Sequence, residues 1–268
     1  MHEAEAAAHG VRCIYQRIDL NRLGCGAEAL PDLLSAAERM GFAGLNITHP
    51  CKQAVMPLLT DISDHARAIG SVNTVVFDAG QRAGHNTDWC AFRRSCLEQL
   101  PGAPFGRVVQ LGAGGAGAAT AYAALDLGVR ELIVVDTIRE RAQSLADRMS
   151  AVFSEKVRAA SAADLGDALR GADGLIHATP TGMAEHPGMA LRASLLRPDL
   201  WVAEVVYVPL ETELLRAARQ TGSRTVDGGG MAVYQAVEAF RLFTGLPADA
   251  SRMRAVFESF DEPSGRVR

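Results

Sequence analysis

Three glycines in one short segment have the spacing that lets a polypeptide backbone approach a phosphate. Residues 107–117 read Arg-Val-Val-Gln-Leu-Gly-Ala-Gly-Gly-Ala-Gly, in which Gly112, Gly114 and Gly117 follow the pattern G-x-G-x-x-G. The first glycine of that pattern permits a tight turn, the second lets a pyrophosphate come close, and the third allows a helix to pack closely on a strand. The helix that follows offers unpaired N–H groups and the positive end of its dipole to an anion. The chemistry predicted is therefore the binding of a dinucleotide.

The acidic residue Asp136 strengthens this prediction, because chains rich in small residues also produce the glycine pattern by accident. Asp136 ends a second apolar run and lies 19 residues after Gly117, where a dinucleotide-binding βαβ unit places the carboxylate that hydrogen-bonds the adenosine ribose. The alternative is a tight strand-to-helix turn with Asp136 as an ordinary acidic cap. Thr137 follows the acid, and no basic residue stands directly there to hold a 2′-phosphate, although Arg139 and Arg141 are near. We therefore predict NAD in preference to NADP.

The elements that must position these residues alternate between strand and helix. Apolar or β-branched runs predict strands at 13–18, 44–48, 72–77, 82–85, 108–111, 131–136, 158–160, 174–178, 202–206 and 224–226. Helices are predicted at 3–9, 30–40, 51–59, 64–69, 88–100, 116–125, 138–149, 162–170, 211–220, 231–243 and 250–260. Residues 78–81, Asp-Ala-Gly-Gln, predict a turn after which 82–85 returns as a hairpin partner. The alternation of strands and helices is typical of α/β proteins with a mostly parallel sheet. The predicted fold class is α/β, with a Rossmann dinucleotide-binding domain plus a smaller, mostly parallel α/β substrate domain.

The composition excludes several classes of protein. The chain has 268 residues, of which 48% are hydrophobic and 22% charged, and its net charge of −4 lacks the basic surplus that nucleic acid or an anionic membrane would require. The five cysteines show no C-x-x-C or zinc spacing and the seven histidines no H-E-x-x-H, so no metal site is predicted. The first residues have no export-signal pattern, and no stretch is a persuasive membrane span. We predict a cytoplasmic protein with reduced thiols and small-molecule partners.

Polar clusters stand at the ends of predicted strands, where open α/β sheets gather ligands. They are N-I-T-H-P-C-K at 46–52, S-V-N-T at 71–74, G-H-N-T-D at 84–88 and D-G-G-G-M-A-V-Y-Q at 227–235, and residues 177–183 read H-A-T-P-T-G-M. With these motifs the chain resembles, over nearly its whole length, the shikimate and quinate dehydrogenase family. Its members carry, in the same order, N-[VI]-T-x-P-x-K, A-V-N-T, G-x-N-T-D, a G-A-G-G-x-G nucleotide loop, N-A-T-P-x-G-M and a late G-x-G-M-x-x-x-Q.

The resemblance implies a reaction, the reversible nicotinamide-dependent oxidation of the ring 3-hydroxyl of shikimate or quinate to the 3-dehydro ketone. One group must take the hydroxyl proton while a hydride leaves for the nicotinamide, and the matching positions make Lys52 and Asp88 the catalytic pair. A carboxylate beside a lysine favours the ammonium, whereas desolvation favours the neutral amine, so the sequence leaves open which of the two is the base. The alternative interpretation is a surface lysine and an aspartate that caps the helix 88–100.

The resemblance also implies the residues that bind the two ligands, a cyclitol carboxylic acid and the dinucleotide. The expected substrate-binding residues are Thr48, Lys52, Asn73, Asp88, Tyr207 and Gln235. The expected cofactor-binding residues are Gly112, Ala113, Gly114, Gly115, Ala116, Gly117, Asp136, Arg141, Thr179, Pro180, Val206, Gly228 and Met231. Neutral donors and acceptors suit a polyol ring, but Asn73 and Asn86 are also typical turn residues, and Gln235 is equally interpreted as an exposed helix residue.

The chain departs from the family pattern at three places. The family often has N-R-T, whose arginine serves the 2′-phosphate of NADP, where residues 136–138 here read Asp-Thr-Ile, which favours the NAD-using quinate/shikimate branch. The residue before Lys52 is usually aromatic in the family but is Cys51 here. We interpret Cys51 as a packing residue whose smaller side chain changes the shape of the pocket floor. Family members begin with a strand and an S-x-[ST]-P segment that holds the substrate carboxylate, whereas this sequence starts at Met1-His2, immediately after that place. We therefore expect the functional polypeptide to extend upstream.

Two domains are expected, a substrate-binding catalytic domain at 1–87 to which 228–268 returns, and a Rossmann NAD-binding domain at 88–227. The protein would act as a monomer or a homodimer. Two alternatives to a quinate/shikimate dehydrogenase stay open. One is a related enzyme such as an aminoshikimate or methylenetetrahydrofolate dehydrogenase, although the Asn73, Asp88 and Gln235 motifs speak against the folate enzyme. The other is a non-catalytic NAD-binding or regulatory homologue, and the choice between quinate and shikimate is also open.

Overall fold

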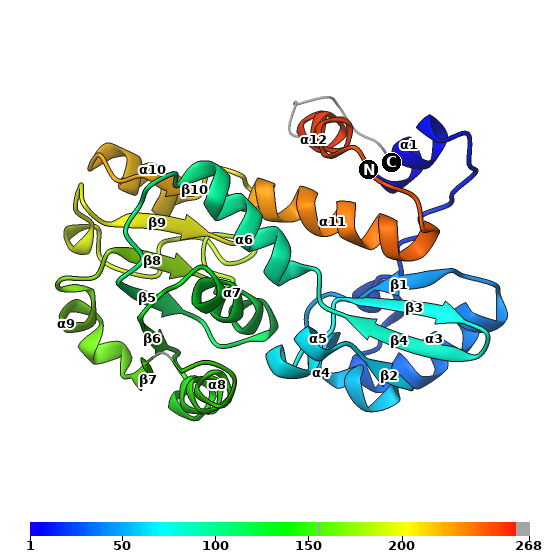
Figure 1. Ribbon diagram of the computed structural model, residues 1–268, viewed down its shortest axis with the longest axis horizontal. Helices are drawn as coiled ribbons and strands as arrows, with labels where there is room; N and C mark the ends of the chain where they lie inside the picture. Colours follow the sequence, from blue (N-terminus) through cyan, green and yellow to red (C-terminus); the bar gives the residue numbers. More distant parts are fainter. Residues whose placement is uncertain (155, 261–268) are drawn as a thin grey trace. The chain divides into compact units, whose positions relative to one another are not determined.

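The computed structural model describes residues 1–154 and 156–260, which divide into two compact units (Figure 1). Unit 1 contains residues 1–63, 72–87 and those from 233 onward, and unit 2 contains residues 64–71 and 88–232. The domain ranges expected from the sequence, 1–87 with 228–268 and 88–227, stay predictions, and their residues 155 and 261–268 lie outside the described part of the chain.

Unit 2 is built on a parallel six-stranded sheet. Its strands are β5 (Arg107–Leu111), β6 (Glu131–Val135), β7 (Lys156–Ala160), β8 (Gly174–His177), β9 (Trp201–Glu204) and β10 (Thr225–Val226). They lie in the order β10-β9-β8-β5-β6-β7, and every neighbouring pair is parallel. The chain runs outward from β5 to β7 and then crosses to β8 on the other side, so the strand order reverses between β5 and β8. Sheets of this kind bind ligands at the carboxyl ends of the strands beside that reversal. The predicted α/β class with a Rossmann sheet is confirmed.

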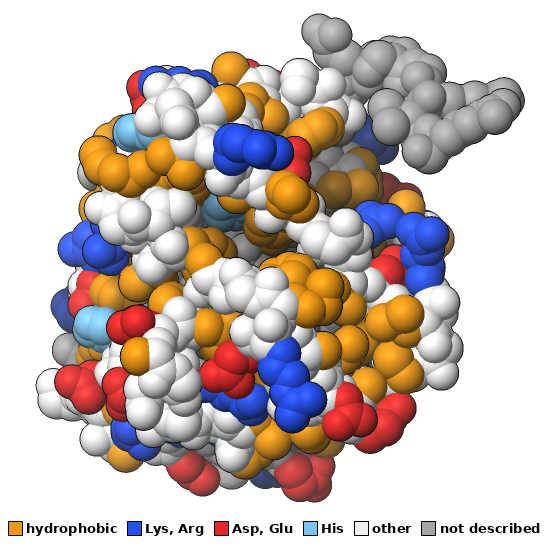
Figure 2. Space-filling model, turned by 90° about the vertical axis from the view of Figure 1, so that its right-hand side faces the viewer, with side chains coloured by type: hydrophobic (Ala, Val, Ile, Leu, Met, Phe, Trp, Pro, Cys, Tyr) orange, Lys and Arg blue, Asp and Glu red, His pale blue; other side chains and the backbone are white. Residues whose placement is uncertain are grey.

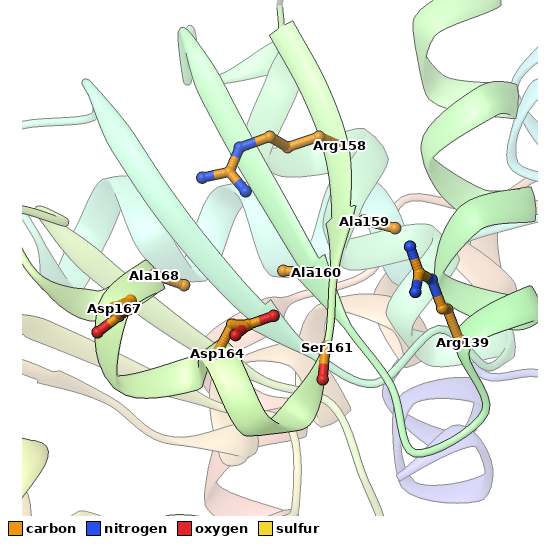
Figure 3. Close-up of a pocket in the computed structure, with 8 residues that line it drawn as sticks. All are labelled: Arg139, Arg158, Ala159, Ala160, Ser161, Asp164, Asp167 and Ala168. Atoms are coloured by element: carbon orange, nitrogen blue, oxygen red, sulfur yellow. The ribbon is translucent and has the colours of Figure 1, made fainter.

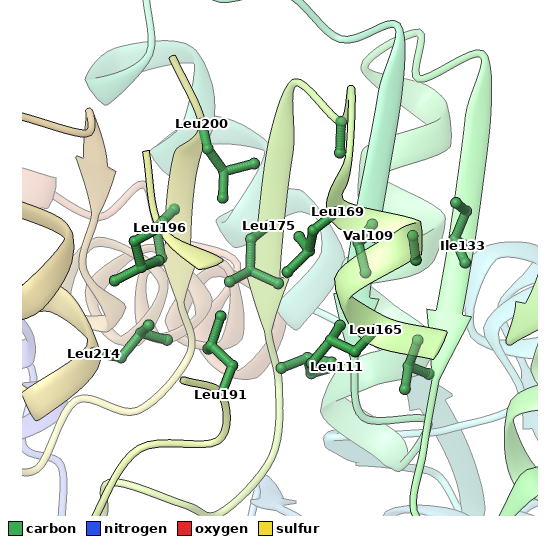
Figure 4. Close-up of a cluster of buried hydrophobic side chains, with 14 of the residues drawn as sticks. Val109, Leu111, Ile133, Leu165, Leu169, Leu175, Leu191, Leu196, Leu200 and Leu214 are labelled. Atoms are coloured by element: carbon green, nitrogen blue, oxygen red, sulfur yellow. The ribbon is translucent and has the colours of Figure 1, made fainter. Parts of the chain in front are cut away.

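Helices cover both faces of this sheet. They are α6 (Asp88–Gln99), α7 (Gly115–Asp126), α8 (Arg139–Val152), α9 (Leu165–Leu169) and α10 (Glu213–Gln220), with the short 3-10 turns η3 (Ala162–Asp164) and η4 (Ala193–Leu195). Unit 2 also contains α5 (Asp64–Ile69), which contacts α7 and α8. Val109 and Leu111 of β5 join a buried apolar cluster with residues of α9 and α10, among them Leu169 and Leu214 (Figure 4). The residue between them, Gln110, points to the other face, as the two-residue period of a strand requires, and contacts α7.

Unit 1 contains a four-stranded sheet of strands β1 (Gly44–Asn46), β2 (Asp61–Ile62), β3 (Thr74–Asp78) and β4 (Gln81–His85), in the order β1-β3-β4-β2. The pairs β1–β3 and β3–β4 are antiparallel and β2–β4 is parallel. This corrects the expectation of a mostly parallel smaller sheet. The reason lies in the turn between β3 and β4, where Ala79 and Gly80 have φ of 45° and 81°. Two positive φ values are typical of the tight hairpin turn that returns a chain antiparallel to itself.

The helices of unit 1 are α1 (His2–Ala8), α2 (Leu20–Leu23), α3 (Leu30–Arg39), α4 (Cys51–Ala54) and α12 (Ala250–Glu258), with 3-10 turns η1 (Ala27–Ala29) and η2 (Met56–Leu58). The long helix α11 (Gly228–Thr244) begins in unit 2 and continues into unit 1. An apolar cluster joins Ala6 of α1 to Val233, Val237 and Phe240 of α11 and Met253 of α12. These contacts hold the first helix against the last two.

Residues 13–18 form no strand, contrary to the sequence-based prediction. A strand requires a hydrogen-bonded neighbour for its backbone groups, but the N–H of Tyr15 donates to the Glu3 carboxylate at 2.9 Å instead. The side chain of Ile14 is 82% exposed. The residues of this segment favour a strand, but in the described part of the chain no neighbouring strand is available for its backbone to pair with.

The surface drawn in Figure 2 carries acidic and basic side chains interspersed among apolar ones. In the described part of the chain, no helix is long and apolar enough to cross a membrane.

Candidate active site

The glycine loop, residues 112–117, joins the end of β5 to the start of α7 in unit 2. Gly112 has a φ of 100°, which glycine adopts without strain, and a Cβ atom there would clash with the carbonyl oxygen of Ala178. A Cβ atom on Gly117 would clash with the carbonyl oxygen of Gly112. For Gly114, in contrast, the described chain places no atom within 4 Å of the Cβ position outside its own neighbours. The loop is therefore closed at its first and third glycines and open at the second, the one that a pyrophosphate must approach.

Gln110 supports this loop from within the sheet. Its side chain is completely buried, and its amide Nε2 donates to the carbonyl oxygens of Gly112 at 2.9 Å and Gly117 at 2.7 Å. Its Oε1 accepts from the hydroxyl of Thr120 at 2.9 Å. One amide thus ties both ends of the loop to the helix that follows. Gln110 was not predicted as a functional residue, although a polar side chain inside the apolar run before the glycines is a signal for one.

Asp136 follows β6 and contacts the glycine loop directly. Its Oδ2 accepts from the backbone N–H of Ala113 at 2.8 Å, and its Oδ1 accepts from the N–H of Ile138 at 2.9 Å. A carboxylate has about four acceptor positions, so this half-buried group retains acceptor capacity for ribose hydroxyls. No side chain caps the first turn of α7, which leaves its N–H groups to a phosphate. The residues present therefore fit the adenosine and pyrophosphate parts of a dinucleotide.

A pocket of about 350 Å³ lies at the carboxyl end of the edge strand β7 (Figure 3). It is lined by Arg139, Arg158, Ala159, Ala160, Ser161, Asp164, Asp167 and Ala168. Arg139, the first residue of α8, reaches it from the loop after β6. Arg141, which the sequence analysis expected to bind cofactor, is exposed on the same helix and is not among the lining residues. Both arginines are exposed on α8, and Arg139 is the one that lines this pocket.

The loops after β8 and β9 lie on the other side of the strand reversal. We call residues 178–182 the β8 loop and residues 205–212 the β9 loop. The β8 loop, with Thr179 and Pro180, is joined to β5 by a bond from the N–H of Ala178 to Leu111 O at 2.8 Å. The β9 loop, with Val206 and Tyr207, packs against the start of α11, since a Cβ atom on Gly228 would clash with the Val206 carbonyl.

The other expected cofactor and substrate residues of unit 2 lie near these elements. Met231 is buried in the first turn of α11, and the Tyr207 side chain is about half exposed. Asp88 is buried as the first residue of α6. Unit 2 therefore contains all of the expected cofactor-binding residues, of which Arg141 is exposed on α8. Two buried residues at the base of the β8 and β9 loops, His177 and Glu204, were missed as functional candidates.

In unit 1, backbone hydrogen bonds bring three of the polar sequence clusters together. The N–H of Ile47 donates to Asn73 O at 2.7 Å, and that of Val72 donates to Lys52 O at 2.9 Å. The N–H of Asn73 donates to His85 O at 3.0 Å. The segments 46–52, 71–74 and 84–87, separate in sequence, therefore meet at one end of the small sheet.

The Asn73 side chain is buried and bonded within the protein. Its Oδ1 accepts from the N–H of Thr87 at 2.8 Å, and its Nδ2 donates to the Thr87 hydroxyl at 2.9 Å. The Thr74 hydroxyl also donates to Oδ1 at 3.0 Å, and Asn46 Nδ2 donates to the same hydroxyl at 3.4 Å. These contacts make Asn73 an organiser of the segment that leads directly into Asp88.

The remaining expected residues of unit 1 are more accessible. Thr48 is exposed, Lys52 is half-buried on α4, and Gln235 is half-buried on α11. Cys51 is buried, and burial raises the pKa of its thiol, which keeps it protonated and agrees with a packing role. Lys52 belongs to unit 1 and Asp88 to unit 2. Within residues 1–154 and 156–260, no group of three His, Cys, Asp or Glu side chains is arranged to hold a metal ion.

Similarity to known proteins extends over nearly the whole chain. Residues 1–75 match the family model described as shikimate dehydrogenase substrate binding domain, and residues 228–256 match that of the shikimate 5'-dehydrogenase C-terminal domain. The chain is 56% identical to the shikimate dehydrogenase (NADP(+)) of Streptomyces avermitilis, over 95% of this chain and 88% of the relative. It is 52% identical to the quinate/shikimate dehydrogenase (NAD(+)) of Corynebacterium glutamicum strain R, over 97% and 92%.

Solved structures show the same fold. The structure of quinate dehydrogenase from Corynebacterium glutamicum in complex with NAD superimposes with a TM-score of 0.89 at 52% identity, and covers 96% of this chain and 92% of that one.

Proposed function

Because the chain belongs to the shikimate dehydrogenase family, we propose that it oxidises the ring 3-hydroxyl of quinate or shikimate reversibly to the 3-dehydro ketone, with NAD as the cofactor. Its relatives are oxidoreductases acting on CH–OH groups, and their names divide between NADP and NAD. The proposal assigns dinucleotide binding to unit 2 and substrate binding to unit 1 together with Asp88 and Tyr207 of unit 2. The fold and the pyridine-nucleotide class of the cofactor follow from the family, whereas the choice of NAD needs an argument from this chain.

The single observation that carries the choice of NAD is the Asp136 carboxylate on the glycine loop. Its two oxygens are held by the N–H groups of Ala113 and Ile138, so the carboxylate cannot turn away from the ribose that would bind there. Hydroxyl groups can donate to it, whereas a 2′-phosphate would place a second anion beside it. Arg139 lies near enough to line the neighbouring pocket, and it is the residue through which NADP would be tolerated.

In the proposed reaction, the bound nicotinamide accepts a hydride from the carbon that carries the hydroxyl. Lys52 and Asp88 take up and release the proton of that hydroxyl. Thr48, Tyr207 and Gln235 supply neutral hydrogen bonds to the ring hydroxyls. Asn73 is proposed to join them, and its hydrogen bonds to Thr87 also orient the residue before Asp88.

The test is reduced-dinucleotide formation by the purified chain with each of the four pairs of quinate or shikimate and NAD or NADP. The variant Lys52→Ala removes the proposed proton carrier. Lys156→Ala is the matched control, since Lys156 is the chain's other lysine and its side chain is 71% exposed. We expect turnover with NAD that Lys52→Ala abolishes and Lys156→Ala preserves.

Each contrary result refutes a separate part of the proposal. Turnover that depends on NADP alone refutes the choice of cofactor. Full activity in Lys52→Ala refutes the catalytic role of that lysine. Dinucleotide binding without turnover of either acid refutes the dehydrogenase and leaves a binding protein.

A further inference from the structure

His177 and Glu204 form a buried pair at the carboxyl ends of the neighbouring strands β8 and β9. The two residues stand opposite each other in the parallel ladder, and each is only 1% exposed. The imidazole Nδ1 lies 2.9 Å and 3.0 Å from the two carboxylate oxygens of Glu204. A histidine and a carboxylate so completely withdrawn from water need hydrogen-bond partners on every side.

Those partners lie in the two loops that follow the strands. On the β8 side, His177 Nε2 is 2.6 Å from the hydroxyl of Thr179, and this hydroxyl accepts from the N–H of Thr181 at 3.3 Å. On the β9 side, Glu204 Oε1 accepts from the N–H of Val206 at 3.0 Å. The pair therefore connects the first residues of both loops.

Glu204 also holds the far end of the β9 loop. Its Oε2 accepts from the hydroxyl of Thr212 at 3.2 Å, and the same hydroxyl caps α10 by accepting from the N–H of Leu215 at 3.2 Å. Val206 and Thr212 are six residues apart, so one carboxylate closes the β9 loop between two fixed points. The loop cannot shift at either point without breaking a bond to a buried charge.

A neutral His177 satisfies all of these contacts. With the proton of neutral His177 on Nδ1, that N–H donates to Glu204 while Nε2 accepts from the Thr179 hydroxyl. The carboxylate then receives three donors, from His177, Val206 and Thr212. Two apolar residues would join β8 and β9 without the cost of burying a charge, but they would fix neither loop. A fully hydrogen-bonded polar network does fix both loops, because each side chain in it can make all of its hydrogen bonds in one orientation only.

We propose that His177 and Glu204 are positioning residues, which hold the β8 and β9 loops in the arrangement that receives the nicotinamide end of the dinucleotide. The inference rests on the proposed function, which places Thr179, Pro180 and Val206 beside that end. It is also supported by position, since Ala178 is bonded to Leu111 directly before the glycine loop and Gly228 abuts the carbonyl of Val206. Neither His177 nor Glu204 touches the ligand in this proposal.

Three variants separate the two halves of the network. His177→Leu removes both imidazole contacts, and Glu204→Gln replaces one acceptor oxygen by a donor. His177→Asn keeps a donor near the place of Nδ1 but ends short of Thr179. Glu131→Gln is the matched control for the glutamate, because it makes the same change at the amino end of β6, where Glu131 bonds to Arg107 and Arg158.

The first measurement is amide hydrogen exchange in the ligand-free protein, which does not depend on activity. We expect His177→Leu to accelerate exchange in both loops, and His177→Asn to accelerate it in the β8 loop alone. Glu204→Gln should accelerate it in the β9 loop, and Glu131→Gln in neither. If His177→Leu does not fold, His177→Asn and Glu204→Gln carry the test. A general loss of protection across unit 2 in these two variants would overturn the proposal, since it would indicate a merely structural role.

The second measurement is calorimetric affinity for NADH and for ADP-ribose, which lacks the nicotinamide. We expect the His177 and Glu204 variants to bind NADH about tenfold more weakly and ADP-ribose as the parent does. An equal loss for both ligands, or none for NADH, contradicts the positioning role. If the parent protein itself binds no NADH, the proposed function fails and this inference fails with it. If the parent binds NADH but the His177 and Glu204 variants show unchanged amide exchange in both loops, the inference alone is refuted.

Discussion

Replacing Asp136 by asparagine should shift the cofactor preference of this protein toward NADP. The change keeps the size of the side chain and removes its charge. The carboxylate at present accepts from Ala113 N–H through one oxygen and from Ile138 N–H through the other. The asparagine amide has one oxygen only, so the N–H of either Ala113 or Ile138 then faces the amide NH2 group, which cannot accept its hydrogen bond. Two effects follow, and they differ in how they act on the two cofactors.

The lost backbone hydrogen bond weakens the site for both dinucleotides. An unsatisfied donor in a partly buried place costs about 1–3 kcal/mol, and this cost is the same whether the ribose carries a phosphate or a hydroxyl. The lost charge acts differently on the two cofactors, because it weakens the hydrogen bonds from the ribose hydroxyls of NAD and removes the repulsion of the 2′-phosphate of NADP. A 2′-phosphate carries about −1.5 to −2 charges at neutral pH. At roughly 5 Å in water, each unit pair repels by about 1 kcal/mol. Removal of the carboxylate should therefore favour NADP by about 1–2 kcal/mol, or roughly tenfold.

The assay is kcat/KM for NAD and for NADP with the preferred acid, and the diagnostic quantity is the ratio of the two. The ratio cancels the common cost of the lost hydrogen bond and isolates the charge. It should change by about tenfold at low salt, and by less at high salt because exposed charges are screened. Asp126→Asn is the control, because Asp126 ends α7 and pairs with Arg93 at 2.5 Å. An unchanged ratio in Asp136→Asn, with both efficiencies lowered equally, would refute the electrostatic argument.

Three further predictions concern unit 2. Gly117→Ala, whose Cβ would meet the Gly112 carbonyl, should cost about 1–3 kcal/mol of stability and weaken NADH binding, as denaturant unfolding and calorimetry would show. For Glu131, burial raises the pKa, but hydrogen bonds from two arginines outweigh this and leave it below 4.5. The stabilisation by ionised Glu131 is therefore present above pH 4.5 and lost as the pH falls through the lowered pKa. The free energy of unfolding of Glu131→Gln should lack this part of the pH dependence. If the variant and the parent lose stability equally over this pH range, the ion pairs do not contribute. Burial raises the pKa of Cys96 to about 12, so thiol labelling read by mass spectrometry should modify it only after unfolding, and rapid native labelling would disprove that burial.

The sequence was sufficient where the structural signal is local. The three glycines lie within six residues, and the apolar runs that flank them are contiguous, so the β5–α7–β6 unit and its parallel sheet could be predicted. Asp136 could be placed at the glycine loop because the length of one βαβ unit fixes where its second strand ends. The site roles assigned by resemblance, those of Lys52 and Asp88 above all, stay predictions.

Pairing between distant segments could not be predicted in the same way. Residues 13–18 have the composition of a strand but no ladder, and strand propensity is decided by neighbours more than by the residues themselves. The smaller sheet was expected to be mostly parallel from the alternation of elements, and only its hairpin at 78–81, a local signal, was predicted and is confirmed. Gln110 was overlooked for a related reason, since its partners on α7 become visible only once the helix is packed on the strand.

The His177–Glu204 pair shows what a sequence lacks even when every residue of a motif is known. The two residues are 27 positions apart and each ends an apolar run, so either is easily interpreted as a polar residue at a strand end. Only the register of β8 against β9 places them opposite each other, and only then do Thr179, Val206 and Thr212 become their partners. A motif that begins at His177 therefore depends on a carboxylate outside it. The geometry of the β8 loop is consequently a property of two strands, because Glu204 on β9 orients the imidazole on β8 that contacts Thr179.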